Sequence, residues 1–308
     1  MDSSKDTLLI SADSHVIEPE DLWSKRLPPA FREQAPQYPK HAFAVHPGGH
    51  DPVERIKAMA EDGVSAEVLY PSLTMDQFGL TDAQLQEACF RVYNDWLIEY
   101  CSHSPDRLFG IAAISTYRID QAIQEAERCK KAGLRGLMVW QVPPDELAFS
   151  TRHYEKLWAA AQEMDMPINL HILTGAPYRP GTVGQKGNDP MRLIRQVNMK
   201  ALYAMNAMIQ FIASGVLERF RGLKIVFIEN ELSWIPFILT QYDKYCARGY
   251  YQDSEMKMLP SEYFERQIFA TFFNDPPSRS LLKDGWMIDN ALWSNDFPHS
   301  NSTWPKSR

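Results

Sequence analysis

The chain has 308 residues, of which 44% are hydrophobic and 12% aromatic, and its formal net charge is −7 at pH 7. This composition can bury a sizeable core, which excludes a disordered chain. The acidic balance and the lack of a lysine and arginine block give no support for nucleic acid or an anionic membrane as partner. No apolar run is long enough to span a bilayer, and the N-terminus is polar, so we expect a cytoplasmic protein. None of the four cysteines forms a C-x-x-C pair, which indicates free thiols in a reducing compartment.

Short apolar segments alternate with segments of helical periodicity along the chain. After the first apolar run, residues 18–40 are rich in proline and charge, which predicts an irregular excursion over one end of the fold. We expect strands over residues 8–10, 64–70, 108–114, 136–140, 167–172, 223–228, 268–273 and 291–294. We expect helices over residues 52–62, 81–102, 120–131, 154–164, 191–214 and 233–247.

Eight buried strands separated by mostly helical segments predict an α/β fold, a (β/α)8 TIM barrel that forms one domain over residues 1–308. An open doubly wound sheet gives a similar alternation, but no glycine-rich phosphate fingerprint follows the first strand. The chain stops at Arg308, shortly after the eighth strand. We therefore expect the helix after that strand to be missing, either because the chain is truncated or because a partner covers the exposed barrel wall.

Acidic and histidine side chains stand at the carboxyl ends of four of the predicted strands. They are Asp13 and His15 at the first strand, His171 at the fifth, Glu229 at the sixth, and Asp296 with His299 at the eighth. Because the catalytic groups of TIM barrels come from the carboxyl ends of several strands, we expect these side chains to meet at one mouth. Each has an ordinary structural alternative, such as a turn cap for Asp13 or a hydrogen-bonded core histidine for His171.

Two histidines with two or three carboxylates suit Zn²⁺, Mn²⁺ or Fe²⁺ better than Ca²⁺ or Mg²⁺, which prefer shells of oxygen. The sequence therefore predicts one divalent metal ion as cofactor. Glu229 and the nearby Glu231 could bridge a second metal, as carboxylates do in dinuclear sites.

Four further side chains are candidates for binding a flat, anionic substrate. Trp140 and Phe297 end the fourth and eighth strands, where aromatic rings could stack on the substrate, although packing between barrel and helices is the alternative. Arg179 lies in the loop that follows the fifth strand, and Arg192 lies just after that loop. Either guanidinium could pair with a substrate carboxylate.

These residues stand within motifs that resemble the metal-dependent amidohydrolase superfamily, in particular the amidohydrolase-related branch around aminocarboxymuconate semialdehyde decarboxylase. The motifs are Ser11-Ala12-Asp13-Ser14-His15, Arg107-Leu108-Phe109-Gly110, Gly133-Leu134-Arg135-Gly136, Asn169-Leu170-His171, Phe227-Ile228-Glu229 with Trp234-Ile235-Pro236, and Ser294-Asn295-Asp296-Phe297-Pro298-His299. The resemblance covers nearly the whole chain and implies that Asp13, His15, His171 and Asp296 bind the metal. The family commonly has a histidine on the sixth strand, where this chain has Glu229.

Two reactions of a small-molecule substrate fit such a site. In non-oxidative decarboxylation, which the resemblance favours slightly, the metal would hold a substrate carboxylate while Asp296 or His299 handles the proton that replaces CO₂. In hydrolysis of an amide, ester or lactone, Asp296 would accept the proton of a water activated by the metal. A dinuclear iron or manganese oxygenase is a third alternative. A non-catalytic subunit is the fourth, and we expect either a homo-oligomer or a hetero-oligomer with a homologous subunit.

Overall fold

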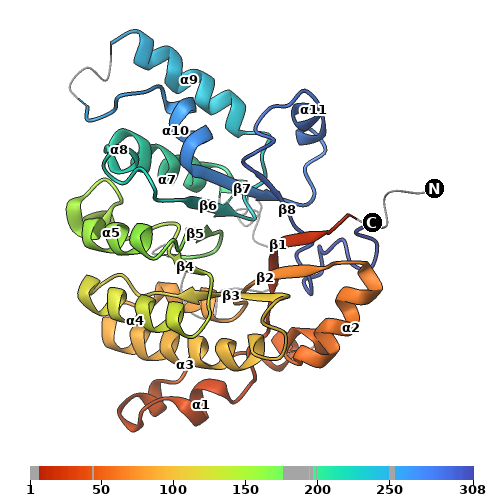
Figure 1. The fold of residues 1–308 in the computed structure, drawn as a ribbon. Helices are drawn as coiled ribbons and strands as arrows, with labels where there is room; N and C mark the ends of the chain where they lie inside the picture. The colour runs from red at the N-terminus through yellow and green to blue at the C-terminus, as the bar shows by residue number, and fades with distance from the viewer. Residues whose placement is uncertain (1–6, 44, 176–193, 195–196, 199, 250–253) are drawn as a thin grey trace.

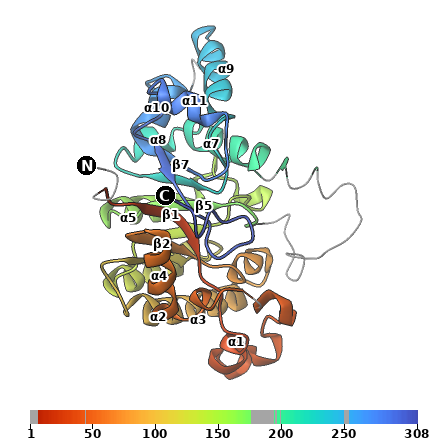
Figure 2. The same cartoon turned by 90° about the vertical axis from the view of Figure 1, so that its right-hand side faces the viewer.

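Eight parallel strands follow one another in sequence order around a barrel, and helices cover its outside (Figures 1 and 2). The computed structural model describes residues 7–43, 45–175, 194, 197–198, 200–249 and 254–308. The strands are β1 (Ile10–His15), β2 (Ala66–Tyr70), β3 (Leu108–Ala113), β4 (Gly136–Val139), β5 (Ile168–His171), β6 (Ile225–Ile228), β7 (Ile268–Phe272) and β8 (Ala291–Trp293). This arrangement confirms the predicted (β/α)8 barrel.

The strands of one half of the barrel are buried on both faces. Every residue of β4, β5 and β6 is buried, because the barrel interior fills one face and helices cover the other. This double burial explains why β4 and β6 read as continuous apolar runs in the sequence. Because the strands are parallel, their carboxyl ends lie at one end of the barrel.

The long helices lie close to their predicted positions. They are α2 (Pro52–Asp62), α3 (Ala83–Cys101), α4 (Ile119–Lys131), α5 (Glu155–Glu163) and α9 (Ile235–Ala247). Helix α2 has the predicted bounds because the Asp51 carboxylate accepts hydrogen bonds from the backbone N–H groups of Val53 and Glu54, and Gly63 ends the helix at φ 71°. Of the helix expected over residues 191–214, α7 (Leu202–Ala213) is described, and most of the preceding part lies outside the described residues.

Two features of the fold differ from the sequence-based expectation. Strand β1 runs on to His15, so Asp13 and His15 lie on the strand itself and not after it. Short helices also occupy stretches for which we expected none: α1 (Leu22–Arg26), α8 (Val216–Arg219), α10 (Pro260–Gln267) and α11 (Ser278–Lys283). Most of them span only one or two turns, too few to produce a clear helical periodicity in the sequence.

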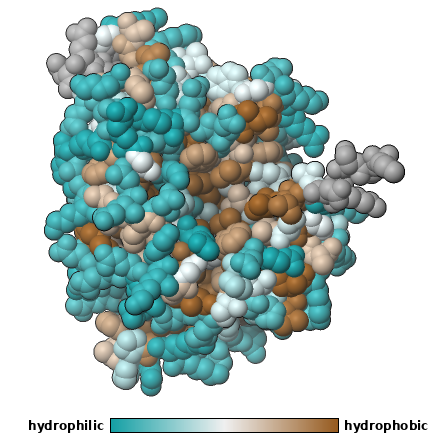
Figure 3. All heavy atoms as spheres, in the orientation of Figure 1, coloured by the Kyte–Doolittle hydropathy of each residue, from teal (hydrophilic) through white to brown (hydrophobic). Residues whose placement is uncertain are grey.

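The barrel closes where β8 meets β1, and this part of its wall is the most exposed. Within the described residues 294–308 no helix follows β8, as expected, and all three residues of β8 are partly exposed. Leu8 and Ile10, before and on β1, are 74% and 48% exposed. Figure 3 shows apolar side chains gathered over the centre of this face, where β7, β8 and β1 lie. Among the described residues, no helix is both long and apolar enough to cross a membrane.

A partly buried ionic cluster joins α3, α4 and the end of β3, and it gives a stability prediction. The Glu125 carboxylate accepts hydrogen bonds from Arg128 at 2.6 and 2.8 Å and from Asn94 Nδ2 at 2.9 Å. Asn94 also bonds the backbone of Ala113. Burial raises the pKa of Glu125, but the hydrogen bonds from Arg128 and Asn94 outweigh it and lower the pKa below the ordinary value of 4.5.

We expect Glu125→Gln to lower the free energy of unfolding by about 1–2 kcal/mol at pH 7, because the charged acceptor is lost. Since the folded-state pKa is lowered, this stabilisation is complete above pH 4.5 and disappears as the pH falls through the folded-state value. Urea unfolding of both proteins between pH 3 and pH 7 measures the difference. Glu99→Gln, which removes the partner of Arg26 on the surface, is the control and should change the stability by less than about 1 kcal/mol at any pH. An equal loss in both variants would contradict the prediction.

Candidate metal centre

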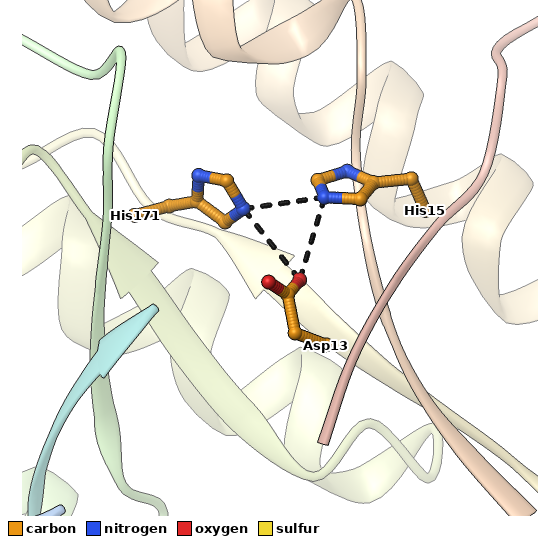
Figure 4. Close-up of side chains that lie close together, drawn as sticks. All are labelled: Asp13, His15 and His171. Carbon is orange, nitrogen blue, oxygen red and sulfur yellow. Dashed lines mark hydrogen bonds and ion pairs between the residues drawn. The ribbon is translucent and has the colours of Figure 1, made fainter. Parts of the chain in front are cut away.

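Asp13, His15 and His171 converge on one point inside the carboxyl-terminal mouth of the barrel (Figure 4). Asp13 Oδ1 lies 3.3 Å from His15 Nε2 and 3.6 Å from His171 Nε2, and the two Nε2 atoms are 3.3 Å apart. Asp296 joins from β8, with Oδ1 3.4 Å from His15 Nε2. The structure therefore brings together all four residues that the resemblance assigns to the metal.

A β-bulge directs Asp13 into this group. Ser11 pairs with Glu67 and Ser14 with Leu69, so three steps along β1 match two along β2 and one residue is extra. As a result, Ala12 lines the barrel interior while Asp13 contacts the histidines, and Ser14 hydrogen-bonds away from the mouth to Asn295. Simple strand alternation correctly puts Asp13 and His15 on the same side, but it contains no sign of the bulge.

Both histidines are fixed in the tautomer that binds metal ions through Nε2. His15 Nδ1 lies 2.8 Å from the Pro71 carbonyl, and His171 Nδ1 lies 3.0 Å from the Ile172 carbonyl. A carbonyl only accepts hydrogen bonds, so each Nδ1 carries the hydrogen and each neutral ring has its lone pair on Nε2. Such backbone partners commonly orient metal-binding histidines.

The donor atoms fit a divalent metal ion. Neither carboxylate oxygen of the fully buried Asp13 has a hydrogen-bond partner, which is costly for a charged group unless a cation is bound there. The two Nε2 lone pairs also face each other and this carboxylate. Ligand atoms bonded to one ion at about 2.1 Å lie roughly 3.0–3.4 Å from their neighbours, close to the separations found here.

Burial and the closeness of the charged and imidazole groups set the pKa values at this site. Burial raises the pKa of Asp13, but attraction to His15 and His171 outweighs it and keeps the pKa well below the usual range. Burial and repulsion from His299 lower the pKa of His15. The Asp13 carboxyl therefore stays ionised and His15 stays neutral near pH 7, the states required of metal ligands.

His299 forms a second group with Asp296 at the same mouth. Its Nδ1 lies 2.9 Å from Asp296 Oδ1, its Nε2 lies 3.0 Å from Ser72 Oγ, and its ring is 4.0 Å from that of His15 between centroids. Burial lowers the pKa of His299, but the carboxylates of Asp296, Glu229 and Asp13 outweigh this and raise it above the ordinary value. His299 can therefore hold a proton beside the metal centre. Asp296 has φ 55°, a left-handed conformation that is rare outside glycine and typical of strained functional sites.

Glu229 reaches the mouth from the end of β6, also with a left-handed φ of 60°. Its pKa is raised to about 7 by burial and by the charge of Asp296, while Lys200 and His171 oppose this rise. Lys200 Nζ lies 3.2 Å from Glu229 Oε1 and 3.9 Å from Glu231 Oε1. Among the described residues, neither glutamate belongs to a group of metal-ligating atoms, so the geometry gives no support for a second metal held by Glu229 or Glu231.

The two aromatic candidates for substrate binding are buried away from the mouth. Trp140 is 1% exposed, packs edge-on against Tyr117 and donates its indole N–H to the Tyr154 hydroxyl. Phe297 is 2% exposed and lies under the guanidinium of Arg55. Both have the packing role that was the alternative in the sequence, and substrate contact stays a prediction for them. Arg179 and Arg192 lie outside the described residues.

Sequence reasoning missed Lys200 and Ser72. Lys200 lies within the helix expected over residues 191–214, where a lysine is ordinary, and its cationic contact with Phe273 depends on the fold. Ser72 follows the end of β2, a strand whose carboxyl end holds no charged residue. Its proximity to a strand end was the signal that could have identified it.

Comparisons with known proteins agree with this geometry. Residues 12–308 match the sequence model of an amidohydrolase family, described as Amidohydro_2: Amidohydrolase. The gamma-resorcylate decarboxylase of Rhizobium radiobacter is 24% identical over 277 residues, covering 80% of this chain and 76% of the relative.

Solved structures share the fold at lower identity. An amidohydrolase from Mycobacterium avium subsp. paratuberculosis K-10 has a TM-score of 0.77 at 19% identity, with 96% of this chain and 91% of that chain covered. A dihydroxybenzoic acid decarboxylase from Polaromonas sp. JS666, solved with bound manganese and the inhibitor 2-nitroresorcinol, has a TM-score of 0.68 at 19% identity, with 97% and 88% covered. Because the family match spans almost the whole chain, the resemblance seen in the sequence is confirmed. The chain belongs to the amidohydrolase family.

Proposed function

We propose that this protein is a metal-dependent carboxy-lyase that removes CO₂ from a small aromatic carboxylate without oxidation. The observation that carries the proposal is the buried group of Asp13, His15 and His171, with Asp296 beside His15 and His299 hydrogen-bonded to Asp296. The gamma-resorcylate decarboxylase relative supports an aromatic carboxylate as the substrate class. The bound manganese of the Polaromonas structure supports Mn²⁺ as the ion.

The reaction requires a proton donor more than a nucleophile. The bond between the ring carbon and the carboxylate carbon breaks, its electron pair stays on the ring carbon, CO₂ leaves, and a proton takes the vacated position. A bound divalent ion supplies positive charge that orients the substrate oxygens and stabilises negative charge during the reaction. The protein must then hold one proton close to the ring carbon.

We assign this proton to His299, with Asp296 as its partner. Protonated His299 donates from Nδ1 to Asp296 Oδ1 and from Nε2 to Ser72 Oγ, which fixes the ring. The carboxylates of Asp296, Glu229 and Asp13 raise its pKa and so favour the protonated imidazole. After transfer to the ring carbon, the neutral imidazole regains a proton from solvent, because its side chain is 29% exposed.

In this proposal, Glu229 and Lys200 form a second part of the mouth, apart from His299 and Asp296. With a pKa of about 7, the Glu229 carboxyl can either donate a hydrogen bond to a phenolic substrate or accept one from it near neutral pH. The positive charge of Lys200 partly offsets the negative charge of the carboxylates at the mouth, which would otherwise repel an anionic substrate. These carboxylates are Asp13, Glu229, Glu231 and Asp296. Glu229 stands at the end of the sixth strand, where the resemblance implies that the family commonly has a histidine.

CO₂ release from a panel of hydroxybenzoates tests the proposal. Protein loaded with Mn²⁺ should release CO₂ and the matching phenol in equal amounts, and protein treated with a chelator should release neither. Re-addition of Mn²⁺ is the matched control and should restore release. Cleavage of esters, amides or lactones without CO₂ release would instead support the hydrolase alternative, and no turnover of either class would support a non-catalytic subunit.

We further propose a single-domain cytoplasmic protein that forms a homo-oligomer. One hydrophobic cluster runs from Val16 to Met287, which supports a single domain. The four cysteines are free and three of them are buried, in keeping with a reducing compartment. Sedimentation equilibrium measures the oligomeric state.

A further inference from the structure

A buried polar cluster lies directly behind the metal ligands, at the junction between the first and last strands. We call it the seam cluster; its members are Ser11, Ser14, Arg55, Asp62, Glu67 and Asn295. All six side chains are buried, and none of them belongs to the groups of metal-ligating atoms at the mouth. The proposed reaction does not use them.

The seam cluster adds side-chain hydrogen bonds at the junction where the described strands form no regular ladder. Each strand from β1 to β7 pairs with the strand that follows it in sequence. No ladder between β8 and β1 is present among the described residues. Instead, Asn295 Oδ1 accepts hydrogen bonds from Ser11 Oγ at 3.1 Å and from Ser14 Oγ at 2.8 Å. Asn295 N donates to Ser11 Oγ at 3.0 Å. Side chains therefore hold the two strands together at this position.

Arg55 extends this connection to the backbone of the ligands. Its Nη1 donates to the His15 carbonyl at 2.6 Å, and its Nη2 lies 3.5 Å from the Phe297 carbonyl, next to Asp296. Its Nε donates to Glu67 Oε2 at 2.5 Å. The same backbone segments bond each other, from His15 N to the Phe297 carbonyl and from Asp296 N to the Asp13 carbonyl. One planar guanidinium thus connects the two segments that provide three of the four ligands.

We propose that Arg55, fixed by Glu67, is a positioning residue that sets the separation of Asp13 and His15 from Asp296 and so determines metal affinity. The inference rests on the metal centre of the proposed function but not on the reaction. Lysine can replace the charge of Arg55 but not its fork of donors, so it can bond one of the two carbonyls and not both. The β1 and β8 segments would then be free to separate at the ligands.

Mn²⁺ titration of the purified protein, without substrate, tests this inference. The EPR signal of free Mn²⁺ gives the dissociation constant, and thermal unfolding of the metal-free protein gives its stability. We expect Arg55→Lys to weaken Mn²⁺ binding by about 10–100-fold, the range seen when partners of metal ligands are removed. Glu67→Gln, which keeps the size of the side chain but weakens its hold on Arg55, should give a smaller loss in the same direction.

Arg107→Lys is the matched control. Arg107 also donates to two backbone carbonyls, those of Ser65 and Val64, but it does so at the opposite end of the barrel, before β2 and β3. It should lower the unfolding temperature and leave the Mn²⁺ dissociation constant within about threefold of the wild-type value.

Three outcomes would overturn the inference: unchanged affinity in Arg55→Lys and Glu67→Gln, an equal loss of affinity in Arg107→Lys, or no Mn²⁺ binding by the wild type. If Arg55→Lys does not fold, Glu67→Gln alone is compared with the control, and unchanged affinity again overturns it. Wild-type protein that binds Mn²⁺ but releases no CO₂ would refute the reaction and leave this inference standing.

Discussion

Replacing His171 by alanine is expected to abolish the retention of metal by the purified protein and, with it, all turnover. Of the four residues that we propose as ligands, His171 alone comes from β5, on the side of the barrel away from the junction of β1 and β8. If a protein metal site binds with on the order of 10–16 kcal/mol, one ligand accounts for about 3 kcal/mol, or more than a hundredfold in affinity. Metal analysis of protein purified without chelator measures the loss.

His153→Ala is the control for this variant. His153 is a partly buried histidine whose Nε2 bonds the Thr116 carbonyl, outside the metal centre. It should keep about one metal per chain, as the wild type does. Full metal retention in His171→Ala would refute the ligand assignment, and retained activity without metal would refute the metal-dependent reaction.

A second large effect is expected for His299→Asn, which should lower kcat by about 10²- to 10⁴-fold while the metal stays bound. The asparagine amide can keep the hydrogen bond to Asp296, but it has no proton to give near neutral pH. The variant therefore separates proton transfer from metal binding. Steady-state kinetics and metal analysis on the same preparation check both parts.

Ser72→Ala is the companion variant, since it removes the hydrogen bond to His299 Nε2 but leaves the imidazole in place. Its loss in kcat should be about tenfold or less. Turnover by His299→Asn at the wild-type rate would show that the proton comes from another group, with Glu229 as the next candidate.

The convergence of the candidate residues could be predicted from sequence because one rule of the fold determines it, whereas their roles as metal ligands came from the family resemblance and stay a prediction. Parallel strands of a barrel end at one mouth, so the positions of Asp13, His15, His171 and Asp296 relative to apolar runs were enough to bring them together. The same rule placed Glu229 and His299 near them. This prediction needed no knowledge of the distances between individual residues.

The finer geometry of the site could not be predicted, because it depends on backbone conformations that strand patterns do not encode. The bulge at Asp13 and the left-handed φ values of Glu229 and Asp296 break the alternation that pattern reading assumes. Arg55 gave no signal because it lies on a helix at a position that periodicity treats as ordinary, and its role appears only once β1 and β8 meet.

The junction of the first and last strands has a consequence for how the metal site comes into being. Ser11 and Asn295 are 284 residues apart in sequence, and the ligands Asp13 and Asp296 lie just beside them. Contacts of such long separation carry the largest loop-closure entropy and form late in folding. A chain growing from the ribosome lacks a complete site until β8 has emerged. Asp296 therefore joins Asp13, His15 and His171 only when the barrel closes, and full metal affinity would report on this final step.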